Sequence, residues 1–132
     1  MLKLKKINKP EKGNSNKDIN WFCKSLCLIS GRDIDSNSNK IITKILKTVS
    51  KHKKVYSEEL ARDLDLKLGL INYHIRNLID SGILIRKNKQ IFIRGGSLKE
   101  AMKEIKENSL SILGDIEIIA EEIDSSFGIN NR

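Results

Sequence analysis

The stretch that decides the fold runs from residue 55 to residue 84 and reads VYSEELARDLDLKLGLINYHIRNLIDSGIL. Ser57 precedes two acids, which predicts a helix N-terminus, because a hydroxyl caps free backbone amides and the helix dipole favours negative charge there. This short helix is expected to end near Asp63. A tight turn then leads into a helix over Lys67–Ser81, which Gly82 closes in the C-cap position.

Segments on both sides of this stretch complete a recognisable order of elements. Two β-branched runs, Ile83–Lys87 and Gln90–Arg94, are separated only by Asn88-Lys89, which predicts a β-hairpin. Upstream, apolar residues recur at helical spacing from about Lys40 to Lys51, with lysines on the opposite side. Three helices followed by a hairpin, the third helix entered through a tight turn, is the order of a winged helix-turn-helix.

The residues themselves support this order. The runs Val55–Leu66 and Leu70–Leu84 resemble the ArsR/MarR-like transcription regulators, particularly archaeal-type ones, whose pattern is an SxEELAxxL helix, a turn, a TVxxHLxxLxxxGLL recognition helix and a wing. The resemblance covers residues 40–94. It implies a winged helix-turn-helix that binds DNA and dimerises through terminal helices. Lys67 stands where that family usually places a small hydroxyl cap, and no metal-binding pattern of the family is present.

Length and charge are consistent with one basic domain. The 132 residues are 39% hydrophobic, enough for a modest core in a single domain, and no apolar run approaches the roughly 20 residues of a membrane span. We therefore expect a soluble, cytoplasmic protein without a membrane partner. Residues 37–96 hold thirteen Lys and Arg against five Asp and Glu, a balance of +8, whereas residues 97–132 balance at −4. The middle segment therefore suits a polyanion such as double-stranded DNA.

The recognition helix should present a polar face outward. With Ile71 pointing inward, Ile75, Leu78 and Ile79 fall on the same stripe at 100° per residue. Asn and Arg on the other side offer two-point hydrogen bonding to adenine and guanine edges in the major groove, and hairpin cations suit phosphates or the adjacent minor groove. The predicted DNA-binding residues are Lys67, Gly69, Asn72, Tyr73, Arg76, Asn77, Arg86, Lys87 and Lys89. The alternatives are a solvated polar helix face and a charged hairpin edge that prevents aggregation.

The N-terminal segments are predicted to be less tightly organised. Residues 1–16 lack apolar periodicity and are expected to form a disordered basic tail. Residues 17–36 are expected to hold a helix over 18–30, capped by Asp18, and part of a polar linker over 33–39. The winged domain is assigned to residues 37–96, and the last segment to residues 97–132.

The last segment is predicted to be one long helix. Ser97 and Glu100 match the capping box, in which the two side chains satisfy each other's free backbone amides. Beyond them, apolar residues recur at alternating spacings of four and three, which is a heptad seam that only Ser109 interrupts. A single amphipathic helix must fold back on its domain or pair with another copy. We predict pairing into a homodimer through Leu98, Met102, Ile105, Ile112, Ile116, Ile119 and Ile123.

No pattern in the sequence indicates catalysis. The two histidines pair with no nucleophile or carboxylate at a catalytic spacing, and no glycine-rich phosphate loop is present, so no catalytic, cofactor or metal residue is predicted. Cys23 and Cys27 are interpreted as reduced thiols, since a metal site would need further ligands. The expected fold is mainly α with a small β-hairpin, and the expected function is sequence-specific DNA binding by a transcription regulator. A winged-helix docking module without specific DNA binding and a binder of structured RNA are the alternatives.

Overall fold

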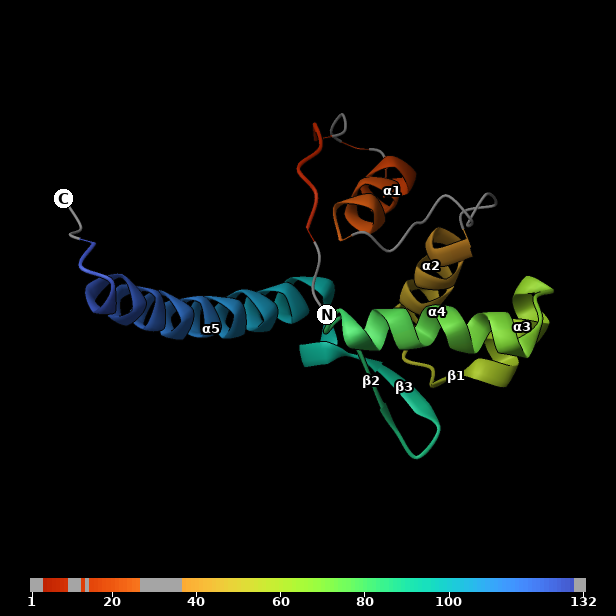
Figure 1. Ribbon diagram of the computed structural model, residues 1–132. Helices are drawn as coiled ribbons and strands as arrows, with labels where there is room; N and C mark the ends of the chain where they lie inside the picture. The colour runs from red at the N-terminus through yellow and green to blue at the C-terminus, as the bar shows by residue number, and fades with distance from the viewer. Residues whose placement is uncertain (1–3, 10–12, 14, 27–36, 130–132) are drawn as a thin grey trace.

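The structure is a computed structural model that describes residues 4–9, 13, 15–26 and 37–129. Its elements are, in order, α1 (Ser15–Ser25), α2 (Asn37–Ser50), β1 (Val55–Tyr56), α3 (Ser57–Leu64), α4 (Leu68–Asp80), β2 (Leu84–Lys87), β3 (Gln90–Ile93), the 3-10 turn η1 (Arg94–Gly96) and α5 (Leu98–Ser126) (Figure 1). The part from α2 to β3 is a winged helix-turn-helix. The predicted fold class, mainly helical with a small β element and a long C-terminal helix, is confirmed.

The β element is larger than the hairpin that was predicted. Strands β2 and β3 pair antiparallel, and β1 adds to the other edge of β3, so that the sheet order is β1-β3-β2. Asn88 and Lys89 form the hairpin turn with φ values of 49° and 71°. Two consecutive residues with positive φ are typical of the two-residue hairpin turn, because the backbone twist of that turn matches the twist of the two strands.

A core of branched aliphatic residues holds α4 against the rest of the domain. Ile71, Ile75 and Leu78 of α4 are fully buried and belong to one cluster with Ile41 and Ile45 of α2. The buried residues of β1, β2 and β3 close the cluster from the other side. Because α4 buries these positions, its remaining side chains must point away from the core.

A polar contact lies inside this core. His74 of α4 is 4% exposed, and its Nδ1 lies 3.1 Å from Oγ of Ser38 on α2. This hydrogen bond satisfies two polar groups that would otherwise lose free energy on burial. Ser38 lies in the first turn of α2, which begins at Asn37, before the apolar run that was used to predict its start near Lys40.

Several predicted boundaries were wrong by a few residues. Helix α1 begins at Ser15 and ends at Ser25, so Asp18 lies in the first turn and is not the cap. The cap of α3 is Tyr56, with no side-chain hydrogen bond, and Ser57 is the first helical residue. The predicted end of the first helix at 27–30, Cys27 and the linker residues 33–36 lie outside the described residues.

The N-terminal segment contacts α1 where it is described. The amide of Lys5 donates to the Ser25 carbonyl at 2.8 Å, and the Trp21 indole Nε1 donates to the Ile7 carbonyl at 3.1 Å. Residues 4–9 therefore run beside α1. The predicted end of the tail at residue 16 was wrong, because α1 begins at Ser15. Disorder of the residues before α1 stays a prediction.

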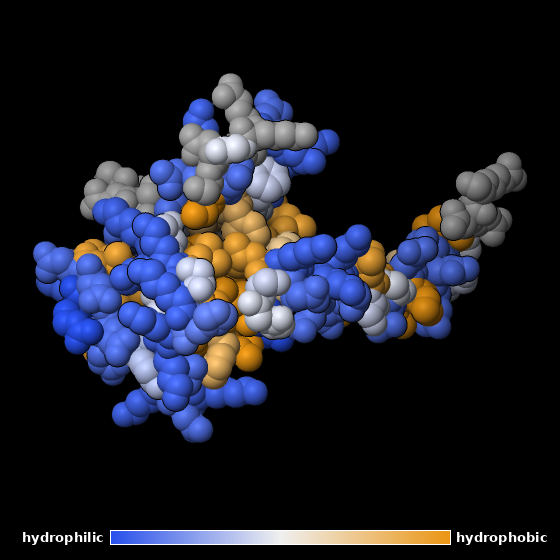
Figure 2. Space-filling view, turned by 180° about the vertical axis from the view of Figure 1, so that it is seen from behind, coloured by the Kyte–Doolittle hydropathy of each residue, from blue (hydrophilic) through white to orange (hydrophobic). Residues whose placement is uncertain are grey.

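Helix α5 starts in the domain and then leaves it. Ser97 accepts a hydrogen bond from the Glu100 amide at 3.1 Å, which confirms the predicted cap. Leu98, Met102 and Ile105 pack against the core, whereas every described residue from 110 onward is exposed. The helix projects from the domain, and apolar side chains recur along it (Figures 1 and 2). No helix among the described residues is long and apolar enough to cross a membrane.

Candidate nucleic-acid interface

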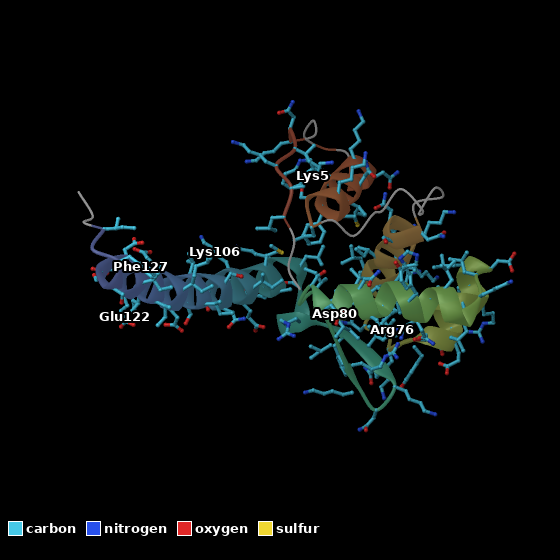
Figure 3. The ribbon with its side chains drawn as sticks, viewed as in Figure 1. Lys5, Arg76, Asp80, Lys106, Glu122 and Phe127 are labelled. Atoms are coloured by element: carbon cyan, nitrogen blue, oxygen red, sulfur yellow. The ribbon has the colours of Figure 1, made fainter. Side chains whose placement is uncertain are left out.

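The outward side of α4 carries the polar residues that were predicted to bind DNA. Tyr73 is 50% exposed and Arg76 is exposed, while Asn72 and Asn77 are half-buried at the edges of the helix. Arg76 and Asp80 lie along the length of α4 in Figure 3. The buried stripe described above fixes this orientation, so the polar face cannot turn inward without exposing three large aliphatic side chains.

The first residues of α4 and its cap are exposed to solvent. Lys67, Leu68 and Gly69 are all exposed, and a Cβ built on Gly69 would meet no atom within 4 Å. Lys67 is the cap residue, and its side chain makes no capping hydrogen bond. The first amides of α4 and the Lys67 ammonium therefore lie at one end of the polar face, an arrangement that suits a phosphate group.

Arg86 of the hairpin connects the wing to α4. Its Nη2 donates to Oγ of Ser57 at 2.6 Å and to Oδ1 of Asn72 at 3.2 Å. Ser57, at the start of α3, is buried, whereas Arg86 as a whole is exposed. One exposed cation thus joins the first residue of α3, the polar face of α4 and strand β2. Sequence reasoning placed Arg86 at the interface but missed this cluster.

The contact with Arg86 orients the Asn72 side chain. A guanidinium has only donors, so it can be met only by the amide oxygen of Asn72, and the amide nitrogen must point the other way. On the same helix, Nε of Arg76 donates to the Asn72 carbonyl at 3.4 Å. Two arginines therefore contact Asn72, Arg86 at its side-chain oxygen and Arg76 at its main-chain carbonyl.

The remaining hairpin cations divide into two kinds. Lys87 and Lys89 are exposed on the arm of the wing. Arg94 instead turns back toward the base of the hairpin, where its Nε donates to the Gly82 carbonyl at 2.8 Å and its Nη1 lies 3.9 Å from Glu104 of α5. Arg94 therefore connects the base of the wing to the turn after α4 and to α5.

A second basic surface lies between α2 and α3. It is a recess of about 260 Å³ whose lining includes five lysines, among them Lys47 and Lys51 of α2 and Lys53 of the following loop. Glu59 and Asp63 also line it, and Lys44 lies 3.8 Å from Asp63. The sequence indicated a basic outer face on α2, and the structure shows that loop 51–54 continues it.

The described residues contain no cluster of three or more His, Cys, Asp or Glu that could hold a metal ion. Cys23 is buried in the core cluster. The polar groups around α4 include the cations Lys67, Arg76 and Arg86 and the amide donors of Asn72 and Asn77. Such groups suit the negatively charged and acceptor-rich surface of a duplex groove.

Residues 38–85 match the family model described as winged helix-turn-helix DNA-binding. The matched segment runs from the start of α2 into β2, so it contains the whole of α3 and α4. Comparison with curated proteins and with solved structures found no match. The predicted winged helix-turn-helix fold is confirmed, and the match supports a DNA-binding domain over residues 38–85. The DNA-contacting residues stay a prediction.

Proposed function

We propose that the protein is a sequence-specific regulator of transcription that binds double-stranded DNA as a homodimer. Helix α4 enters the major groove, and the hairpin contacts the backbone or the adjacent minor groove. The observation that carries this proposal is the exposed polar face of α4, with Asn72 oriented by Arg86 of the wing. The narrower resemblance to archaeal-type ArsR/MarR-like regulators belongs to this proposal, and we propose no catalytic role.

The geometry of the face suits direct contact with base edges. Asn can both donate to N7 and accept from N6 of adenine, and Arg can donate twice to guanine. Asn72 keeps its NH₂ group free of Arg86, and its oxygen has a second lone pair. Arg76 is exposed next to it. We therefore assign base readout to Asn72 and Arg76, and we assign Tyr73 and Asn77 to contacts beside them.

Lysines around this face are proposed to bind phosphates. Lys67 lies at the start of α4, and Lys87 and Lys89 extend along the wing, all of them exposed. The basic recess between α2 and α3 adds to the same positive field. Each phosphate contact releases condensed counterions, so the affinity for DNA should fall steeply as salt rises.

The homodimer is proposed from the free part of α5. Ile112, Ile116, Ile119 and Ile123 are between 50% and 57% exposed. Leu113, which is 59% exposed, lies on one flank of this apolar surface. Contiguous apolar side chains on a projecting helix favour burial against another molecule, and a second copy brings two recognition helices to one duplex.

The test begins with selection of a duplex from a random pool by the full chain. Affinities of Asn72→Ala and Arg76→Ala are then measured on the selected duplex and on an unrelated one, with Lys24→Ala, an exposed lysine of α1, as the control. Each interface substitution should cost about 1 to 3 kcal/mol on the selected duplex and much less on the unrelated one. Equal losses on both duplexes would show that these residues do not read bases. A chain without affinity for any duplex at low salt would instead favour a docking module.

A further inference from the structure

The charges on α5 are unevenly distributed along its length. From residue 107 to residue 126 the helix holds six Asp and Glu and no Lys or Arg, whereas Lys99, Lys103 and Lys106 lie near its start. Lys106 near the domain and Glu122 near the free end mark the two parts in Figure 3. Two such helices side by side in the same direction would keep the three lysines of one copy away from the acids near the free end of the other.

One flank of the helix has a particular order of charges. At 100° per residue, Lys103 and Lys106 lie on the same flank of the apolar seam as Glu117 and Asp124. All four side chains are exposed. This flank, which we name the charged flank, is therefore positive near the domain and negative near the free end. When two helices pack antiparallel through their seams, like flanks face each other in reversed direction. Only then does the positive end of each charged flank meet the negative end of the other.

We propose that two copies of the chain pair through an antiparallel contact of their α5 helices, with the two-fold axis near residue 114. This inference rests on the proposed homodimer and specifies its geometry. In this register Ile112 packs against Ile116 of the second copy, and Ile105 against Ile123 of the second copy. The layer between these two places Ile119 against Ser109. Lys103 and Lys106 then lie beside Asp124 of the second copy.

The base of α5 offers a place for the end of the second helix. A hollow of about 560 Å³ lies between the end of α4 and α5, and Ile79, Ile105 and Ile112 are among its lining residues. In the antiparallel register, Ile123 of the second copy lies over Ile105, at this hollow. Phe127, which is 79% exposed on the free helix, follows one turn later. The free end of each α5 thus meets a hollow beside the other domain in which Ile79, Ile105 and Ile112 lie among polar lining residues.

The exposed ion pairs contribute little individually, so the orientation is best tested by cross-linking. Single cysteines are introduced into the full chain after Cys23 and Cys27 are replaced by alanine. In the antiparallel register, Leu113 lies within about 3 Å, measured along the axis, of Leu113 of the second copy and on the same side, while Ile123 is about 27 Å from its own counterpart. In a parallel pair, Ile123 meets Ile123, and the two Leu113 side chains lie on opposite flanks.

Leu113→Cys should form a covalent dimer under oxidising conditions, and Ile123→Cys should stay at monomer size on a non-reducing gel. Circular dichroism of both variants and of the cysteine-free parent checks that they fold, and the parent should give no cross-link. If the Ile123→Cys variant formed a covalent dimer and the Leu113→Cys variant did not, the proposal would be overturned in favour of a parallel pair. Cross-linking of neither variant would overturn this register. Analytical sedimentation of the cysteine-free parent tests the homodimer separately. A monomeric parent would contradict the homodimer in the proposed function.

Discussion

Arg86 and Asn72 meet across the junction of the wing and the recognition helix, with Nη2 of Arg86 3.2 Å from Oδ1 of Asn72. The same Nη2 lies 2.6 Å from Oγ of the buried Ser57. The wing is therefore linked to α4 through Asn72, the side chain to which the proposed function assigns base readout. A change in Arg86 should affect base recognition by Asn72 even where Arg86 itself does not contact that base.

This coupling can be measured with a double-mutant cycle on the selected duplex. Arg86→Ala and Asn72→Ala should be non-additive in binding free energy by about 0.5 to 1 kcal/mol or more, because each removes the other's partner. Lys87→Ala, which alters the next residue of the same strand, should combine with Asn72→Ala additively. Additive behaviour of the Arg86 pair as well would show that the hydrogen bond does not matter for recognition.

The lysines of the wing should act through phosphates. Lys87→Ala should weaken binding by similar factors on selected and unrelated duplexes, and the slope of log affinity against log salt should fall by about one unit. Lys24→Ala on α1 serves as the control for loss of one positive charge. An unchanged slope for Lys87→Ala would place this lysine outside the interface.

The hairpin turn contains a residue in an unfavourable conformation. Lys89 has a φ of 71°, where a side chain costs about 1 to 2 kcal/mol and glycine costs little. The free energy of unfolding of Lys89→Gly should therefore be about 1 kcal/mol higher than that of Lys89→Ala. Both substitutions remove the charge, but only glycine relieves the backbone strain. Urea unfolding of the two variants tests this, and equal midpoints would contradict the left-handed turn.

Two glycines should respond to alanine with opposite signs. Gly114 lies inside α5 with no atom within 4 Å of an added Cβ, so Gly114→Ala should raise the free energy of unfolding by about 0.5 to 1 kcal/mol. Gly82 has a φ of +90°, and its added Cβ would lie 2.9 Å from Ile105 Cγ1, so Gly82→Ala should be destabilising. Thermal unfolding compares the two. Destabilisation by Gly114→Ala would show that another surface approaches α5 closely at that position.

Local patterns in the sequence were sufficient for much of the fold. The predicted helix Lys67–Ser81 and the observed α4 (Leu68–Asp80) differ by one residue at each end, because the apolar stripe and the Ser81-Gly82 stop are both local signals. The Ser97 cap of α5 was likewise visible as a four-residue motif. Features of this kind depend on residues that are close together in the sequence.

Features that depend on distant residues were missed. Strand β1 has only two residues and exists because Val55 pairs with Ile91. Helix α2 extends back to Asn37, where Ser38 bonds to His74, although the sequence there resembles a polar linker. The Arg86 cluster joins residues 14 and 29 positions away. Such contacts leave no periodic pattern in a single sequence.

The central claim is that α4 enters the major groove of a duplex, and methylation interference on the selected duplex tests it most directly. Dimethyl sulfate modifies guanine N7 in the major groove and adenine N3 in the minor groove. We predict that N7 methylation within each half-site blocks binding of the full chain, and that Arg76→Ala loses this sensitivity at one guanine of each half-site. Interference confined to adenine N3, with no effect of N7 methylation anywhere in the site, would contradict the account.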